Sequence, residues 1–415
     1  MTVATFAHES AHPLDEAPKG FMYGALFAAI AIQHIYVFSF NWAPELRMPL
    51  AGALTAGHLL LAAITVMARP APWVFGLLLS AACLVVSLIP AHFLGFGVMT
   101  SFDAQGALRK LILPIMMIWV LSYPLALPAG LLRWCAILSI LLGTAIALTG
   151  PPVYVSGTPR LGSITGGLDQ MHPSAKFLAL QLVLVDLMRR GRMMSPILSW
   201  GLIGVCFGVL LGYGGRNELV FVFAYYGSLV YFHYRGITIV KWSPPILLGF
   251  FLLVSYIALT LGTDVQSWGS GRIGAWEYRI HALVARDLMP LFFGGGVGSD
   301  VMWTPEWSYA DEGLTAHNDY LHFMMEHGLV GLVALMLFIY AIWLRVFAEG
   351  RAVLIGVLVN SFFSNGFFQS PLLSMNLALL LSASMVVTLT RNQPESASRP
   401  EDSSPDGVMV TRMPG

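Results

Sequence analysis

The sequence has very little charge for its length. Asp, Glu, Lys and Arg make up 11% of its 415 residues, whereas roughly 25% is usual in soluble domains. A surface exposed to water cannot be built from so few charged side chains. The formal net charge is zero and no basic run with interleaved aromatic residues occurs, which argues against a nucleic-acid partner.

Cysteine is also scarce, and the common motifs for metals and nucleotides are missing. Cys83, Cys135 and Cys206 all lie in apolar stretches without CxxC spacing, so we expect no disulfide and no structural metal. The chain has no Asp-x-Asp pair, no P-loop and no Gly-x-Ser-x-Gly elbow. These absences disfavour nucleotide-driven chemistry, and we expect no metal and no cofactor.

Long apolar runs take the place of charge. Hydrophobic residues make up 57% of the chain, and about 20 apolar residues in succession let a helix cross a bilayer. We therefore expect an all-α integral membrane protein with about twelve transmembrane helices. The predicted spans are 21–40, 48–68, 72–90, 109–127, 131–150, 174–188, 195–214, 217–232, 243–262, 328–345, 351–367 and 371–390.

Basic residues predict the direction of these spans. Residues 1–20 lack the positive region of a cleaved signal peptide, so the first span is expected to be a retained anchor. With a cytoplasmic N-terminus, the short inner connections hold Arg69, Arg133 and the cluster 189–192, as the positive-inside rule favours. Residues 391–415 are polar and predict a disordered tail. Both termini are therefore expected to be cytoplasmic.

Two predicted outer segments, 151–173 and 263–327, are longer than a helix connection requires. The second is rich in tryptophan and glycine, a composition suited to a folded cap at the membrane surface. We place the chemistry there. The predicted regions are a cytoplasmic N-terminus (1–20), nine spans (21–262), an outer catalytic loop domain (263–327), three spans (328–390) and a cytoplasmic tail (391–415).

The predicted outer face keeps basic residues that the positive-inside rule should have thinned. Binding an anion such as a diphosphate is one reason to keep them, because guanidinium groups offer several donors in one plane. Arg216 lies in Gly-Tyr-Gly-Gly-Arg-Asn-Glu, where two spans meet; the alternative is an ion pair with Glu218 that closes the helix hairpin. Arg272 follows Gly271, and Arg279 would share its helix face. Arg160 and Lys176 complete the candidates.

A histidine precedes the tenth predicted span. In His317-Asn318-Asp319-Tyr320, either Asn318 or Asp319 can cap the incoming helix and leave His317 at its mouth. A histidine there could act as a general base, although most single histidines are structural. His322 and Glu326 lie four residues apart without an HExxH motif, which makes a metal site weak.

These motifs resemble the O-antigen ligase and O-antigen polymerase superfamily of bacterial envelope glycosyltransferases, most closely the ligases. The resemblance covers about the C-terminal two-thirds of the chain. The residues that carry it are His317 to Leu321 with Gly328 and Gly331, Gly271 and Arg272 with Trp276, the glycine-flanked Arg216, Gly294 to Gly298, Arg160-Leu161-Gly162 and His172-Pro173-Ser174.

The resemblance implies a helical membrane core in the bacterial inner membrane, capped by a periplasmic loop domain. It implies an undecaprenyl-diphosphate-linked glycan as donor and the lipid A core oligosaccharide as acceptor. It further implies that His317 deprotonates the acceptor hydroxyl, while Arg216 and Arg272 hold the diphosphate without a metal. Arg279 and Arg160 are weaker candidates for the same anion, and Asn318, Tyr320 and Lys176 are possible supporting residues.

Two other functions remain open at this point. A glycan polymerase would share the donor, the chemistry and the motifs. A permease or flippase belongs to a different class, but ion-coupled carriers tend to place ionisable groups in the middle of their spans, and acids are nearly missing there. The sugars that would be joined cannot be predicted from these residues.

Overall fold

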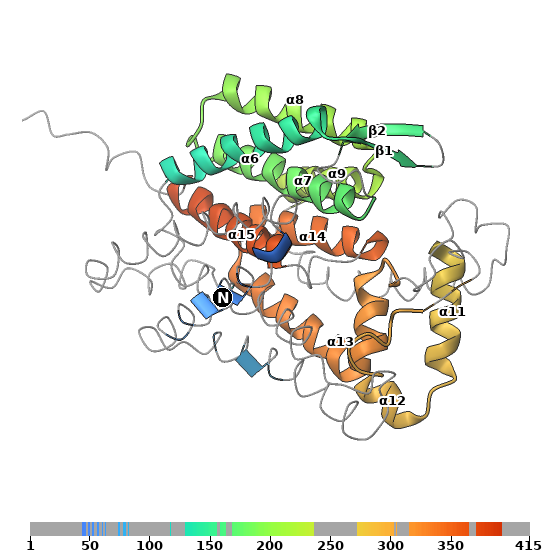
Figure 1. The fold of residues 1–415 in the computed structure, drawn as a ribbon. Coiled ribbons are helices and arrows are strands. Elements are labelled where there is room, and N and C mark those ends of the chain that lie inside the picture. Colours follow the sequence, from blue (N-terminus) through green and yellow to red (C-terminus); the bar gives the residue numbers. More distant parts are fainter. Residues whose placement is uncertain are drawn as a thin grey trace, which may run out of the picture.

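The computed structural model describes residues 129–155, 158–162, 168–235, 272–302, 304, 315–364 and 371–391, with 44–46 and isolated positions between 49 and 117. Helices dominate this part of the chain (Figure 1). They are η2 (Pro44–Leu46), α6 (Ala129–Thr149), α7 (Leu168–Arg190), α8 (Pro196–Tyr213), α9 (Arg216–Arg235), α11 (Arg272–Val284), α12 (Leu288–Phe293), α13 (Asp319–Arg345), α14 (Ala348–Phe363) and α15 (Pro371–Arg391).

The ends of α8 illustrate why these helices begin and stop where they do. The Ser195 hydroxyl accepts a hydrogen bond from the Leu198 N–H, and Pro196, which lacks an N–H, occupies the first turn. At the other end, Gly214 adopts a left-handed conformation with φ 63° and closes the helix. The span 195–214, predicted from its apolar residues, agrees with this helix.

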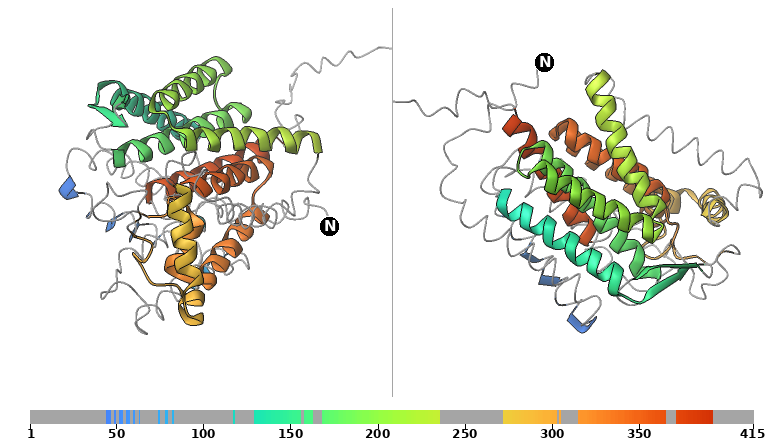
Figure 2. Two further views of the ribbon diagram at one scale, coloured as in Figure 1. Left: turned by 90° about the vertical axis from the view of Figure 1, so that its right-hand side faces the viewer. Right: turned by 90° about the horizontal axis from the view of Figure 1, so that it is seen from above.

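α7 is the central helix of the bundle. It packs against α6, α8, α9 and α15, and every residue from 175 to 188 is buried. α14 packs against α9, α13 and α15. α11 and α12 lie to one side of the bundle, where they contact α13 (Figures 1 and 2). The N-terminal end of α13 therefore lies between the bundle and this side layer.

The protein is a membrane protein by the length and composition of its helices. Three described helices have apolar stretches long enough to cross a membrane, at Leu132–Thr149, Pro196–Tyr213 and Asp319–Arg345. Large apolar side chains such as Leu148, Ile197 and Leu211 are exposed, as lipid-facing positions require. Seven predicted spans coincide with the helices α6 to α9 and α13 to α15. The other five fall on residues described at isolated positions or not at all.

The expectation of an all-helical chain needs one correction. In segment 151–173, which is predicted to lie on the outer side, β1 (Pro152–Val155) and β2 (Thr158–Gly162) form an antiparallel hairpin in which Val153 pairs with Arg160. Val153 is buried and Tyr154 is exposed, the alternation of a strand with one covered face. The β-branched and aromatic residues of this short run favour a strand. α7 then begins at Leu168, before the predicted start at 174.

α13 differs most from its predicted boundaries. It begins at Asp319, not at residue 328, and Gly328 interrupts it with φ 64° and ψ −164°. Such a conformation is open only to glycine. A side chain at Gly328 would also collide with the backbone of Phe292 and Gly294. The glycine thus ends a first segment, covered by α11 and α12, and starts a second segment in a new direction.

Candidate functional site

The first turn of α13 is capped as the sequence predicts. The Asn318 side-chain oxygen accepts hydrogen bonds from the N–H groups of Tyr320 at 3.0 Å and Leu321 at 3.1 Å. The buried Tyr320 hydroxyl donates to the carbonyl of Leu358 in α14 at 2.8 Å. The cap defines where α13 begins, and the Tyr320 hydrogen bond holds this end of α13 against α14. His317 is the residue immediately before the cap.

His317 has a strained backbone. Its φ is +49°, a left-handed conformation that a residue with a Cβ adopts at a cost of about 1–3 kcal/mol. The preceding residue is held on both sides, because the Ala316 N–H donates to Asp300 at 2.8 Å and the Trp276 indole donates to the Ala316 carbonyl at 2.7 Å. Asn318 is held by the helix it caps. The surroundings therefore impose this conformation and present a half-buried imidazole at the mouth of α13.

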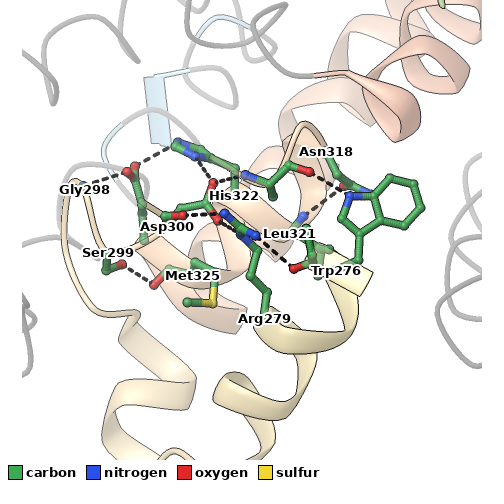
Figure 3. A network of polar contacts seen from close by, with 12 residues as sticks. Trp276, Arg279, Gly298, Ser299, Asp300, Asn318, Leu321, His322 and Met325 are labelled. Carbon is green, nitrogen blue, oxygen red and sulfur yellow. Dashed lines mark hydrogen bonds and ion pairs between the residues drawn. The ribbon is translucent and has the colours of Figure 1, made fainter. Parts of the chain in front are cut away.

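Asp300 is the centre of a polar network beside the first turn of α13 (Figure 3). One carboxylate oxygen accepts from Arg279 Nε at 2.7 Å, and the other lies 3.0 Å from His322 Nδ1 and also accepts the Ala316 N–H. Arg279 also donates to the carbonyls of Asp300 at 3.0 Å and Ala275 at 2.9 Å. The side chains of Arg279 and Asp300 are fully buried. Since both charges are paired, the network is a rigid support.

The glycine-rich stretch 294–298 wraps this network onto α13. The N–H groups of Gly295 and Gly296 donate to the carbonyls of Met325 and Glu326. Glu326 accepts the Gly298 N–H at 2.7 Å and lies 3.0 Å from His322 Nε2. A side chain at Gly294 would collide with the Glu326 backbone. The glycines are therefore needed for a close approach of two backbones.

Arg272, at the start of α11, reaches across to the turn between α8 and α9. Its guanidinium donates to the Phe363 carbonyl at 2.8 Å and to the Asn217 side chain at 3.2 Å. Asn217 also donates to Phe363 at 3.2 Å, and its own carbonyl accepts from Asn360 at 2.5 Å. Arg216 is the first residue of α9, directly before Asn217; its side chain lies outside the described atoms. Arg272 is thus placed beside the backbone of Arg216.

A second group of charges lies between α7, α9, α11 and the start of α13. Lys176 is buried and is attracted by the negative charges of Glu218 and Asp319, while Arg272 repels it. Glu218 and Asp319 are also buried. Neither carboxylate oxygen of Glu218 receives a hydrogen bond from another described residue. We call Lys176, Glu218 and Asp319 the Lys176 cluster. It connects Arg272 to the first turn of α13, which directly follows His317 and Asn318.

Arg160 caps the C-terminal end of α8. From β2 it donates to the carbonyls of Tyr213 at 2.9 Å and Gly214 at 3.3 Å, where a helix end favours a cation. A side chain at Gly214 would meet the Arg160 guanidinium at 2.6 Å, so the glycine makes room for it. The Tyr213 hydroxyl donates to Gly162 in return. Arg160 therefore lies at the same turn as the backbone of Arg216.

The structure separates the predicted site residues into two groups. Arg160, Arg272 and Lys176 lie around the turn that begins α9 and the start of α13. Arg279 is helical and seven residues from Arg272, but it is fully buried against Asp300 and has no exposed surface for an anion. The structure therefore places Arg279 in the Asp300 network, and diphosphate binding by this residue stays a prediction. Sequence reasoning missed Asp300, because a single aspartate after a glycine-rich loop carries no recognisable motif.

No metal-binding group of three or more His, Cys, Asp or Glu side chains occurs within the described part of the chain. No protein-family model, no curated protein and no solved structure matches the chain. The function is therefore inferred from the residues and contacts around the start of α13. These residues are the half-buried His317, the Asp300 network beside it, and the basic side chains of Arg160, Arg272 and Lys176 nearby.

Proposed function

We propose that the protein is a membrane glycosyltransferase of the O-antigen ligase type. It transfers a glycan from undecaprenyl diphosphate to a hydroxyl of the lipid A core, on the periplasmic side of the bacterial inner membrane. Twelve spans and two cytoplasmic termini are part of this proposal. The observation that carries it is the strained, half-buried His317 before a capped helix, because such conformations are found mainly where function requires them.

In the proposed reaction, His317 removes the proton from the acceptor hydroxyl. The hydroxyl oxygen forms a bond to the anomeric carbon, and the bond from that carbon to the diphosphate oxygen breaks. Undecaprenyl diphosphate leaves with the bonding electrons, and the proton remains on His317. One displacement on the face opposite the leaving group inverts the anomeric carbon.

Arg216 and Arg272 are the proposed partners of the diphosphate. The start of α9 supports this pairing, because Arg272 contacts Asn217, the residue next to Arg216. Guanidinium groups can hold two phosphate oxygens at once and stabilise the charge that develops as the bond breaks. Because these cations supply the positive charge, we expect transfer to continue in excess EDTA. Loss of transfer after chelation, restored by a divalent ion, would contradict this part of the proposal.

The proposal is tested by the product that purified protein forms in proteoliposomes. A lipid-linked glycan is supplied with either lipid A core or a second lipid-linked glycan. The ligase assignment expects glycan joined to the core, whereas a longer lipid-linked glycan would identify a polymerase. Movement of the lipid-linked glycan across the bilayer, without a new glycosidic bond, would identify a flippase and overturn the enzyme assignment.

A further inference from the structure

A cavity of about 310 Å³ lies where α6 begins, α7 ends and α8 begins. The turn that joins α7 to α8 is at the left of Figure 1. α7 carries Lys176 in its first half and Arg189 in its last turn. At 1.5 Å per residue these positions are about 20 Å apart along the helix, so the cavity is remote from the Lys176 cluster. It is a separate site from the one described above.

Three arginines line this cavity: Arg133, Arg189 and Arg192. No carboxylate is among the described residues that line it. Arg189 is held in place, because its guanidinium lies 2.6 Å from the buried Asp186 carboxylate and 4.6 Å from the centre of the Trp200 ring. The positive-inside rule explains why arginines gather at one membrane side, but it does not require them to converge on one cavity.

The turn between α7 and α8 and the first turn of α8 form the rest of the cavity lining. Arg192 is exposed and has φ +56°, so the turn holds it in a left-handed conformation that residues with a side chain rarely adopt. Ser195 and Pro196, at the N-terminal end of α8, complete the lining. The first turn of an 18-residue helix carries partial positive charge.

The cavity lies beside the first residues of two membrane-length apolar stretches, a position that suits contact with lipid headgroups. The membrane-length stretches of α6 and α8, Leu132–Thr149 and Pro196–Tyr213, both begin beside it. Trp134 and Trp200 are 62% and 55% exposed there, and tryptophan gathers at the membrane–water interface. Ile197, one residue beyond the cavity lining, is 88% exposed. An occupant of the cavity would therefore have apolar protein surface directly beside its charged group.

We propose that this cavity binds the phosphodiester headgroup of an anionic phospholipid. The three guanidinium groups contact the phosphate, and the acyl chains lie against the exposed apolar face of α8. Free phosphate offers the same anionic oxygens, but it gains nothing from Ile197 and Trp200. Zwitterionic phospholipids carry a phosphate whose charge is cancelled within the headgroup. The proposal is therefore specific for a lipid with net negative charge.

The test is lipid binding to the full chain in detergent, measured by native mass spectrometry. The wild type is expected to bind phosphatidylglycerol more tightly than phosphatidylcholine. Each basic residue near a membrane surface contributes a factor of about five, so Arg133→Gln with Arg192→Asn should weaken phosphatidylglycerol binding about 30-fold. Asn is chosen at position 192 because it tolerates a left-handed backbone.

Two controls keep the result interpretable. Arg192→Asn alone changes one exposed side chain and should weaken binding about fivefold in a protein that remains folded. Arg351→Gln removes an arginine at a helix end outside the cavity and should leave binding unchanged. Unchanged phosphatidylglycerol affinity in the double variant, equal affinity for the two lipids, or displacement of the lipid by inorganic phosphate at equal concentration would each overturn the proposal.

Discussion

The two buried polar regions beside His317 differ in how their charges are satisfied. Around Asp300, the carboxylate is hydrogen-bonded by Arg279 and by the Ala316 N–H, and it contacts His322. In the Lys176 cluster, Glu218 attracts Lys176, yet no other described residue donates a hydrogen bond to its carboxylate. Both regions are buried. The Glu218 carboxylate therefore lacks the hydrogen bonds from other residues that the Asp300 carboxylate receives.

This difference indicates separate tasks for the two regions. A buried charge that is paired and hydrogen-bonded makes the backbone around it rigid. Here the Asp300 carboxylate holds Ala316, the residue before His317. A buried charge without hydrogen bonds is costly and is retained mainly where function requires it. We therefore interpret the Asp300 network as the support of His317 and the Lys176 cluster, with Arg272, as the region that meets substrate charge.

The largest expected effect comes from Asp300→Ala, which leaves the Arg279 guanidinium buried and unpaired. Breaking a buried pair on one side typically costs about 3–5 kcal/mol, so the variant should lose most of its folded yield and thermal stability. Size-exclusion profiles and thermal unfolding measure this. Asp287→Ala is the matched control, because Asp287 is exposed on the same segment and its side chain makes no cap hydrogen bond. Equal stability of the two variants would refute the support role.

Arg272→Lys should act on transfer more than on folding. Lysine keeps the charge but loses the planar donors that the proposed diphosphate contact requires. A hydrogen bond to a charged group contributes about 1.5–3 kcal/mol, so donor binding and transfer should fall about tenfold to a hundredfold at normal abundance. Arg351→Lys, at another helix end, should keep the wild-type rate. A wild-type rate for Arg272→Lys would remove it from the diphosphate site.

The smallest expected effect is on stability in Glu218→Gln. This change removes a negative charge that receives no hydrogen bond from another described residue, and the shape of the side chain is kept. We expect a loss of thermal stability of about 1 kcal/mol or less, because Lys176 retains the attraction of Asp319. A loss as large as that of Asp300→Ala, measured in the same unfolding assay, would show that both regions are structural supports.

Local signals in the sequence predicted much of this architecture. The glycine end of α8 and the cap at the start of α13 involve neighbouring residues only, so the sequence predicted them. The role of Asp300 could not be predicted, since its three partners, Arg279, Ala316 and His322, lie 16 to 22 residues away from it in the sequence. Arg272 and Arg279 of α11 also show that contacts between distant segments could not be predicted from the sequence. A shared helix face predicted a shared ligand for them, but one turns to Asp300 and the other to Asn217.

The most direct test of the account is His317→Gly. Glycine adopts φ near +49° without strain, so this variant removes the imidazole and keeps the backbone that the surroundings impose. We predict thermal stability equal to or above that of the wild type, retained binding of the lipid-linked donor, and transfer reduced by about 10²- to 10⁴-fold. A wild-type transfer rate, or a defect confined to loss of folded protein, would contradict the assignment of His317 as the general base.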